Sequence, residues 1–218
     1  MRLQILLKTL FATTLFAVGS AQAAEKPNIV LILADDLGHA DLGYRGSKIK
    51  TPNIDALAKG GARLEAYYGL PLCSPARAAL MTGFYPMRHG LQTAVIFPNH
   101  KYGLPTDVKT LPQALKEVGY ETYMLGKWHL GHADRKFWPN QRGFDHFYGN
   151  CVGEVDYFTK DRAGVLDWQR NGQFVKDEGY YTAQIGDEAI QLIEQHLRRI
   201  SLAHSLSSGR QPLPLSPP

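Results

Sequence analysis

The run Asn28-Ile29-Val30-Leu31-Ile32-Leu33 indicates the architecture of this chain more directly than any other stretch. It is continuously apolar and rich in β-branched residues, which is typical of a strand buried on both faces near the centre of a parallel sheet. The run leads to Asp35-Asp36. Adjacent carboxylates directly after a buried strand are costly unless their charges are used, and such oxygen ligands suit Ca²⁺ or Mg²⁺. A helix cap or a solvated turn is the alternative for this pair.

Strand and helix patterns alternate along the rest of the chain. The remaining predicted elements are strands at residues 62–68 and 121–125, and helices at residues 52–60, 110–118 and 180–197. Such alternation predicts an α/β fold with helices on both faces of a sheet. Active groups in these sheets gather at the carboxyl ends of the strands. Asp35-Asp36, Cys73 and the segment Lys127-Trp128-His129 all follow predicted strands.

The stretch Pro71-Leu72-Cys73-Ser74-Pro75-Ala76-Arg77 carries a candidate nucleophile. We expect Ser74 to cap a helix whose first residue is Pro75. Cys73 would then lie beside unpaired helix N–H groups, which stabilise an oxyanion or a sulfate, and Arg77 could point back toward it from about one turn along the helix. The only other cysteine is Cys151. A disulfide between Cys73 and Cys151 is the alternative; otherwise Cys151 is predicted to be a small buried residue.

Lys127 and His129 form a second candidate pair. In an extended segment, residues two apart share a face, so an ammonium and an imidazole would point the same way. The lysine can bind a sulfate oxygen, and the histidine can shuttle a proton near neutral pH. Two ordinary surface residues are the alternative. The histidines of the chain lack the spacing of a zinc site, and Asp41 is predicted to serve only as a cap.

The two ends of the chain differ from its middle. Residues 1–23 have the positive charge, the short apolar run and the Ala21-Gln22-Ala23 sequence of a cleaved signal peptide, which predicts export to a bacterial periplasm or secretion and no stable membrane anchor after cleavage. A buried N-terminal helix is the alternative. Residues 24–196 form the predicted globular part, and residues 197–218 are a predicted disordered tail dominated by serine and proline.

The charge of the chain constrains its partners. The formal net charge is +4 over 218 residues, with the basic residues dispersed along the sequence. A dispersed positive charge does not predict nucleic-acid binding, whereas it suits an anionic substrate.

Four blocks in order resemble the sulfatase family, over about residues 26–195. They are the strand and acidic pair from Pro27 to Gly38, the helix start from Thr51 to Asp55, the signature from Cys73 to Gly83, and the block from Gly119 to Gly131. Softer blocks resemble the arylsulfatase B branch, which includes N-acetylgalactosamine-4-sulfatases. These blocks are residues 90–92, 142–145, 147–149 and 155–158.

The resemblance implies a fold and a chemistry. The fold would be alkaline-phosphatase-like, with a central, mostly parallel sheet flanked by helices. Cys73 would be oxidised to formylglycine by a formylglycine-generating enzyme, and one hydroxyl of the hydrated aldehyde would attack the sulfur of an aryl or sugar sulfate ester. Asp35, Asp36 and residue 73 would be ligands of calcium, in preference to magnesium. Arg77 would hold the hydrate, Lys127 would bind the sulfate, and His129 would help to release it.

One departure from the family pattern leaves a second interpretation open. Family members are longer and carry a second histidine, a further metal-ligand pair and another lysine after the long helix, none of which can be placed here; His196 and His204 are left unassigned. The chain would then be a sulfatase domain truncated at its C-terminal side. The alternative to an active sulfatase is therefore a catalytically incomplete fragment, from a frameshifted or split gene, with no or weak binding of sulfated glycans. A phosphatase or phosphonate hydrolase is a more distant alternative.

Overall fold

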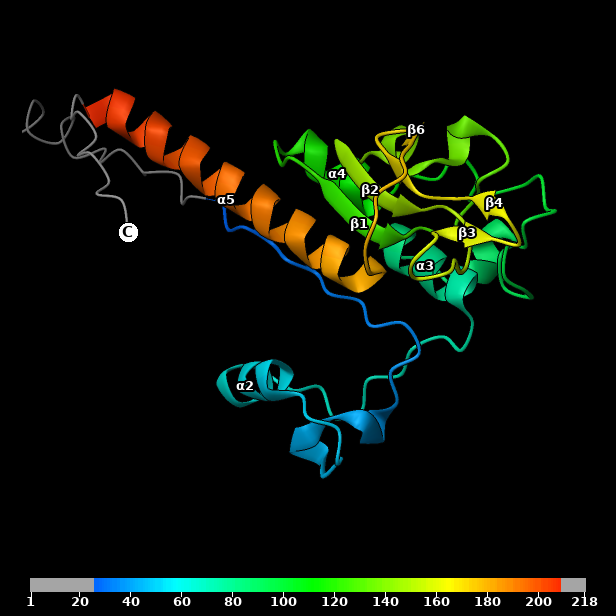
Figure 1. Ribbon diagram of the computed structural model, residues 1–218, viewed down its shortest axis with the longest axis horizontal. Coiled ribbons are helices and arrows are strands. Elements are labelled where there is room, and N and C mark those ends of the chain that lie inside the picture. Colours follow the sequence, from blue (N-terminus) through cyan, green and yellow to red (C-terminus); the bar gives the residue numbers. More distant parts are fainter. Residues whose placement is uncertain (1–25, 209–218) are drawn as a thin grey trace, which may run out of the picture. The chain divides into compact units, whose positions relative to one another are not determined.

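The computed structural model describes residues 26–208, and the side chains of residues 26–196 (Figure 1). The predicted signal peptide at residues 1–23 lies outside the described residues. The chain divides into two units, Met1–Ala62 and Arg63–Pro218. Among the described residues, none of the helices has the length and apolar character needed to cross a bilayer.

The described part of the first unit is held together around one short helix. It contains the 3-10 turns η2 (His39–Asp41) and η3 (Gly43–Arg45) and the helix α2 (Pro52–Gly60), which has the predicted bounds. The Thr51 hydroxyl accepts a hydrogen bond from the Gly43 amide at 2.8 Å and donates one to Asp55 at 2.7 Å. Asp55 also accepts from the Tyr44 amide at 3.0 Å, so the start of α2 anchors the preceding turns.

The strand predicted at residues 28–33 is not formed. The segment is irregular, and its apolar side chains are between 49% and 79% exposed. A strand exists only when its N–H and C=O groups pair with a neighbour, and a hydrophobic run does not specify that neighbour. The strand predicted at residues 62–68 is also not formed, for the same reason, and Leu64, Tyr67 and Tyr68 are exposed.

The second unit is built on a mixed sheet with helices beside it (Figure 1). The strand order is β1-β2-β5-β6, with β1 and β2 parallel and the other pairs antiparallel; β3 and β4 form a separate hairpin. The strands are β1 (Tyr123–Lys127), β2 (His146–Asn150), β3 (Asp161–Arg162), β4 (Val165–Leu166), β5 (Gln169–Arg170) and β6 (Gln173–Phe174). The helices are α3 (Cys73–Thr82), α4 (Leu111–Glu117) and α5 (Tyr181–Ser208), with short turns η4 (Pro86–His89), η5 (Arg135–Phe137) and η6 (Pro139–Arg142).

A compact apolar cluster lies under the end of β1. Trp128 is 1% exposed and Leu130 is 0% exposed, and the Trp128 indole donates to the Phe137 carbonyl at 2.8 Å. The other buried members of this cluster are Ala78, Leu91, Ile96, Leu104, Phe147 and Cys151. The segment after β1 thus belongs to the core, which restricts how its polar residues can be placed.

The strands β1 and β2 approach each other closely at two glycines. Gly126 and Gly149 are register partners. A Cβ atom on Gly149 would overlap the Gly126 carbonyl oxygen and lie 2.7 Å from the Gly126 nitrogen. Only residues without a side chain fit this crossing of two backbones.

Buried ionic groups fasten α5 to the sheet. Glu188 on α5 is 8% exposed, lies 2.8 Å from His146 Nε2 on β2, and forms an ion pair with Arg170 on β5. The Arg170 guanidinium lies 4.1 Å from the centre of the Tyr148 ring. The helix extends to Ser208, beyond the end expected from the sequence, so the prediction of a disordered tail from residue 197 is wrong up to that residue.

A buried lysine ties the loop that follows β2 to the segment that precedes α5. Lys160 is 1% exposed, and its ammonium donates to the carbonyls of Phe158 at 3.0 Å, Asp177 at 3.1 Å and Gly179. Three carbonyl acceptors satisfy the three protons of the ammonium, which allows its burial.

Candidate active site

The helix α3 begins at Cys73, two residues earlier than predicted. Leu72 is the N-cap residue, and its carbonyl accepts from the Ala76 amide at 2.9 Å. The Cys73 side chain is partly exposed. Its place in the first turn puts the thiol beside the unpaired amides and the positive end of the helix dipole, which favour an anion.

Ser74 does not cap this helix, which corrects the prediction from sequence. The Ser74 hydroxyl is fully buried, donates to the His129 carbonyl at 2.9 Å and accepts from the Ile96 amide at 3.0 Å. Ser74 is part of the helix, and the Ser74 hydroxyl instead bonds to two segments that are distant in sequence. The start of α3 is therefore tied to the segment that follows β1.

Arg77 provides a second link to that segment. Its guanidinium Nη1 donates to the carbonyl oxygen of Lys127, the last residue of β1. The predicted nucleophile, the arginine and the lysine–histidine segment therefore lie together in the second unit, at the carboxyl end of β1. This is the end of the sheet at which the sequence predicts active groups.

The expectation that Lys127 and His129 share the face of an extended strand is wrong. The strand β1 ends at Lys127, and His129 adopts a left-handed conformation with φ of 60°. The chain still follows β2, because the amides of Trp128 and His129 donate to Asn150 at 2.9 Å and Cys151 at 3.1 Å. The positive φ turns His129 into the protein, where it is 5% exposed, whereas Lys127 is partly exposed.

The His129 ring is enclosed by neighbours that the sequence did not reveal. Its Nε2 lies 3.1 Å from the Ile96 carbonyl oxygen. A Cβ atom on Gly153 would lie 2.5 Å from ring atom Cε1 and 2.7 Å from Nε2, so a glycine is required beside the ring. Neither Ile96 nor Gly153 stands in a block with a recognisable pattern, and no local signal could have identified them.

Asp35 and Asp36 belong to the first unit and are exposed. Asp36 has φ of 59°, in the left-handed region that aspartate tolerates better than most residues. Two neighbouring carboxylates with exposed oxygens fit the donor chemistry of a calcium ion. Asp41 accepts from the Gly38 amide at 2.8 Å, which confirms its predicted capping role.

Cys73 and Cys151 are both described, and neither forms a disulfide. Cys151 is 1% exposed, and Gln169 Nε2 donates to its sulfur at 3.2 Å. Burial, followed by the nearby Asp167 carboxylate, raises the pKa of the Cys151 thiol well above its usual value, so this cysteine is unreactive. The prediction of a small buried residue is confirmed, and the alternative of a Cys73–Cys151 disulfide is not formed.

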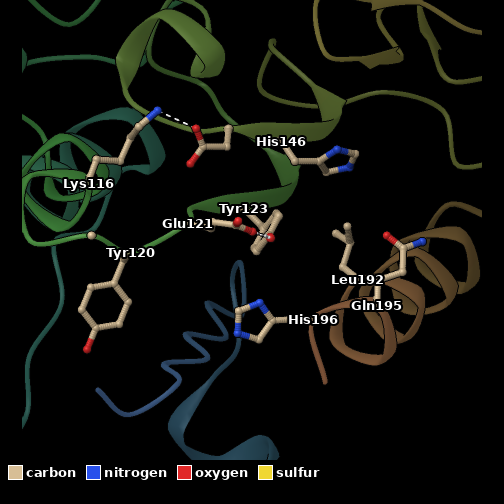
Figure 2. A pocket seen from close by; sticks show the side chains of 10 residues that line it. Lys116, Tyr120, Glu121, Tyr123, His146, Leu192, Gln195 and His196 are labelled. Carbon is tan, nitrogen blue, oxygen red and sulfur yellow. Dashed lines mark hydrogen bonds and ion pairs between the residues drawn. The ribbon is translucent and has the colours of Figure 1, made fainter. Parts of the chain in front are cut away.

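A cavity of about 570 Å³ lies around the opposite end of β1 (Figure 2). Side chains from the start of β1, the end of α4 and the helix α5 line it, and Figure 2 shows the ion pair of Lys116 with Asp145 at its border. None of the predicted catalytic residues lines this cavity, so it is separate from the candidate site.

Comparisons with known proteins agree on one family. The sulfatase family model matches residues 27–208. Arylsulfatase J of Mus musculus is 45% identical over 175 residues, covering 77% of this chain and 29% of the relative. N-acetylgalactosamine-6-sulfatase of Mus musculus is 38% identical over 218 residues, covering 90% of this chain and 41% of the relative.

A solved structure gives the same answer for the fold. The crystal structure of Ps i-CgsB has a TM-score of 0.73 at 40% identity, covering 80% of this chain and 42% of that one; the same protein has been solved in complex with k-i-k-neocarrahexaose. The chain thus spans less than half the length of the proteins it matches. Because the family model covers most of the chain and both curated relatives are sulfatases, the chain belongs to the sulfatase family.

Proposed function

We propose that this chain carries the nucleophile side of a sulfatase active site and serves the hydrolysis of sulfate esters. The observation that carries the proposal is the contact of two segments far apart in sequence. Arg77 and Ser74, on the first turns of α3, bond to the backbone carbonyls of Lys127 and His129. These bonds hold the backbone of Lys127 and His129 against the first turns of α3, which begins at Cys73, and a helix N-terminus stabilises a bound sulfate.

Each side chain has a role that follows from its chemistry. Cys73 is the residue that a formylglycine-generating enzyme would convert, and the hydrated aldehyde would supply a hydroxyl nucleophile. Arg77 would hold the hydrate, and Lys127 would bind and orient the negatively charged sulfuryl oxygens while the S–O ester bond breaks. His129, enclosed in the core, would hold or move a proton while the alcohol and then sulfate leave.

Asp35 and Asp36 would hold a divalent cation together with the group at position 73. Sulfatases as a family use a formylglycine and a divalent metal ion, and two adjacent carboxylates favour calcium over magnesium because calcium accepts irregular oxygen coordination. The ion would neutralise charge on the sulfate oxygens.

Sulfated glycans are the substrates we favour. The relatives include N-acetylgalactosamine-6-sulfatases, and Ps i-CgsB has been solved in complex with k-i-k-neocarrahexaose, a sulfated oligosaccharide, so sugar sulfates are represented among the matches. A 4-sulfated N-acetylgalactosamine is the finer proposal from the sequence blocks. Export to a periplasm or secretion would bring the protein into contact with sulfated glycans.

A catalytically incomplete polypeptide is the second candidate. The observation that favours it is the exposed apolar run at residues 28–33, which directly precedes the proposed metal ligands. Ligands on an unpaired segment are held loosely, and losses within one catalytic unit are strongly non-additive. Under this alternative the chain would bind sulfated glycans weakly or not at all.

One experiment separates the two candidates. The chain is co-expressed with a formylglycine-generating enzyme, the conversion of Cys73 is measured by peptide mass spectrometry, and hydrolysis of a chromogenic aryl sulfate is followed with calcium present. Conversion of Cys73 with turnover that Cys73→Ala abolishes, and that Cys151→Ala retains, supports the sulfatase proposal. Conversion without turnover supports the incomplete polypeptide. Absence of conversion in the folded and co-expressed chain contradicts both the role of Cys73 and the mechanism.

A further inference from the structure

The Ser74 hydroxyl, next in sequence to Cys73, joins three separate segments. It accepts from the Ile96 amide at 3.0 Å and donates to the His129 carbonyl at 2.9 Å. Ile96 and His129 also bond directly, since His129 Nε2 lies 3.1 Å from the Ile96 carbonyl oxygen. The three residues therefore form a closed ring of hydrogen bonds.

This ring of bonds determines where the imidazole proton lies. A carbonyl oxygen can only accept, so the His129 nitrogen facing Ile96 must be the donor, and Nε2 carries the proton. In the neutral imidazole, Nδ1 is then the basic nitrogen. The carbonyl of Ile96 selects the tautomer, and the amide of Ile96 is in turn held by Ser74.

The surroundings leave the His129 imidazole little freedom to move. Ser74 and Ile96 are both 0% exposed and His129 is 5% exposed, so water does not readily replace a lost partner. Gly153 lies so close to the imidazole that a Cβ atom would not fit between them. The backbone of His129 is also fixed, because its left-handed conformation is uncommon for a residue with a side chain and requires support from its neighbours.

We propose that Ser74 is a positioning residue, which together with the Ile96 backbone and Gly153 holds His129 in one orientation and one tautomer. The contribution of this positioning to turnover rests on the proposed function; the positioning itself does not. Removing the Ser74 hydroxyl would leave the buried Ile96 amide and the buried His129 carbonyl without their shared partner. The two backbone segments would then shift or open to solvent.

The first test uses nuclear magnetic resonance of the full, unconverted chain in mildly alkaline solution, where an ordinary imidazole is neutral. Long-range ¹H–¹⁵N spectra report the tautomer of His129, and amide exchange reports Ile96. In the native chain we expect one His129 tautomer with the proton on Nε2. In Ser74→Ala we expect a mixture of tautomers and about tenfold faster exchange of the Ile96 amide.

Three further variants separate positioning from general stability. Ser74→Thr keeps the hydroxyl and should restore the single tautomer. Gly153→Ala should displace the ring without touching Ser74, whereas Gly186→Ala, where a Cβ atom meets nothing within 4 Å, should leave the ring unchanged. Thr82→Val removes a hydroxyl from the same helix, one that bonds to Ala78, and should not alter His129.

The outcomes are distinct. Unchanged His129 and Ile96 signals in Ser74→Ala overturn the proposal. Equal acceleration of exchange throughout the second unit also overturns it, because the hydroxyl would then act on stability alone. In converted protein that hydrolyses the aryl sulfate, Ser74→Ala should lower kcat about tenfold per formylglycine with little change in KM. If the native chain shows no turnover, the proposed function fails for this chain, and the spectra still decide the positioning.

Discussion

Two candidate site residues, Asp36 and His129, have left-handed backbones, with φ of 59° and 60°. Each such conformation costs about 1 kcal/mol or more for a residue with a side chain, and such residues gather at functional sites. For His129 the surrounding hydrogen bonds explain how the conformation is held. The sequence predicts the identity of both residues but not these conformations; for His129 the contacts that hold the conformation come from distant segments.

Asp145 gives a prediction for acid stability. Burial alone would raise its pKa, but hydrogen bonds from Lys116 and Thr122 outweigh burial and hold the pKa of this carboxyl below its usual value. The ionised group therefore stabilises the fold fully above about pH 3.9, the ordinary aspartate value, and this stabilisation is lost as the pH falls through the lower folded-state pKa.

We expect Asp145→Asn to lower Tm by no more than about 2 °C near neutral pH, because the carboxylate is 38% exposed and solvent screens its ion pair with Lys116. The difference from the native chain should shrink progressively in acid. Thermal unfolding followed by circular dichroism across this pH range is the measurement, and Asp187→Asn, exposed on α5, is the control. A deficit that stays constant down to strong acid would show that the charge of Asp145 is not what matters.

At the scale of elements, helices were predicted better than strands. The bounds of α2 and the start of α5 agree closely with the sequence pattern, because caps, prolines and glycines next to a helix are local signals. The helix α4 (Leu111–Glu117) lies within the predicted range 110–118, and the Thr110 amide donates to the Gln113 side chain at 2.9 Å. The strand β1 was also predicted, with a shift of two residues at each end.

The short antiparallel strands were missed, although one had a signal. Asn171 and Gly172, with φ of 50° and 80°, connect β5 to β6. An Asn-Gly pair is a strong indication of a two-residue hairpin turn. Strands of two residues have no hydrophobic period, however, so the flanking pattern gave no support.

The contact between β1 and β2 predicts a severe effect of one added methyl group. Gly149→Ala would place a Cβ atom within the Gly126 backbone, and we expect a loss of about 3 kcal/mol or more. Gly186→Ala, on α5 with open space around it, should instead stabilise the chain by about 0.5–1 kcal/mol. Urea denaturation of both variants tests this contrast, and similar midpoints for the two would refute the close crossing.

For the whole molecule, the main difference between expectation and structure is the run at residues 28–33. Its composition predicts a strand buried in a sheet, but among the described residues Val30 and Ile32 are 71% and 79% exposed and no strand lies beside them. The sequence could not supply the partner, because pairing is decided by segments distant in the chain. An exposed, β-branched segment of this kind promotes association between copies.

We therefore expect the chain to self-associate, and Val30→Ser with Ile32→Ser to reduce this association. Light scattering after size-exclusion chromatography, at several protein concentrations, measures the effect. Leu57→Ser is the control, because Leu57 is 68% exposed but stands on the helix α2. If the control reduces association as much as the double variant, exposure of apolar surface in general is responsible and not this segment.

The buried ammonium of Lys160 has a consequence for chemical labelling. Amine-reactive esters modify the unprotonated, accessible form of a lysine, and Lys160 is 1% exposed with three carbonyls around its nitrogen. In the folded chain it should remain unacylated while exposed lysines such as Lys109 and Lys136 react. Labelling of Lys160 would show that the loop after β2 has separated from the segment before α5. The reactivity of this one side chain therefore measures partial unfolding.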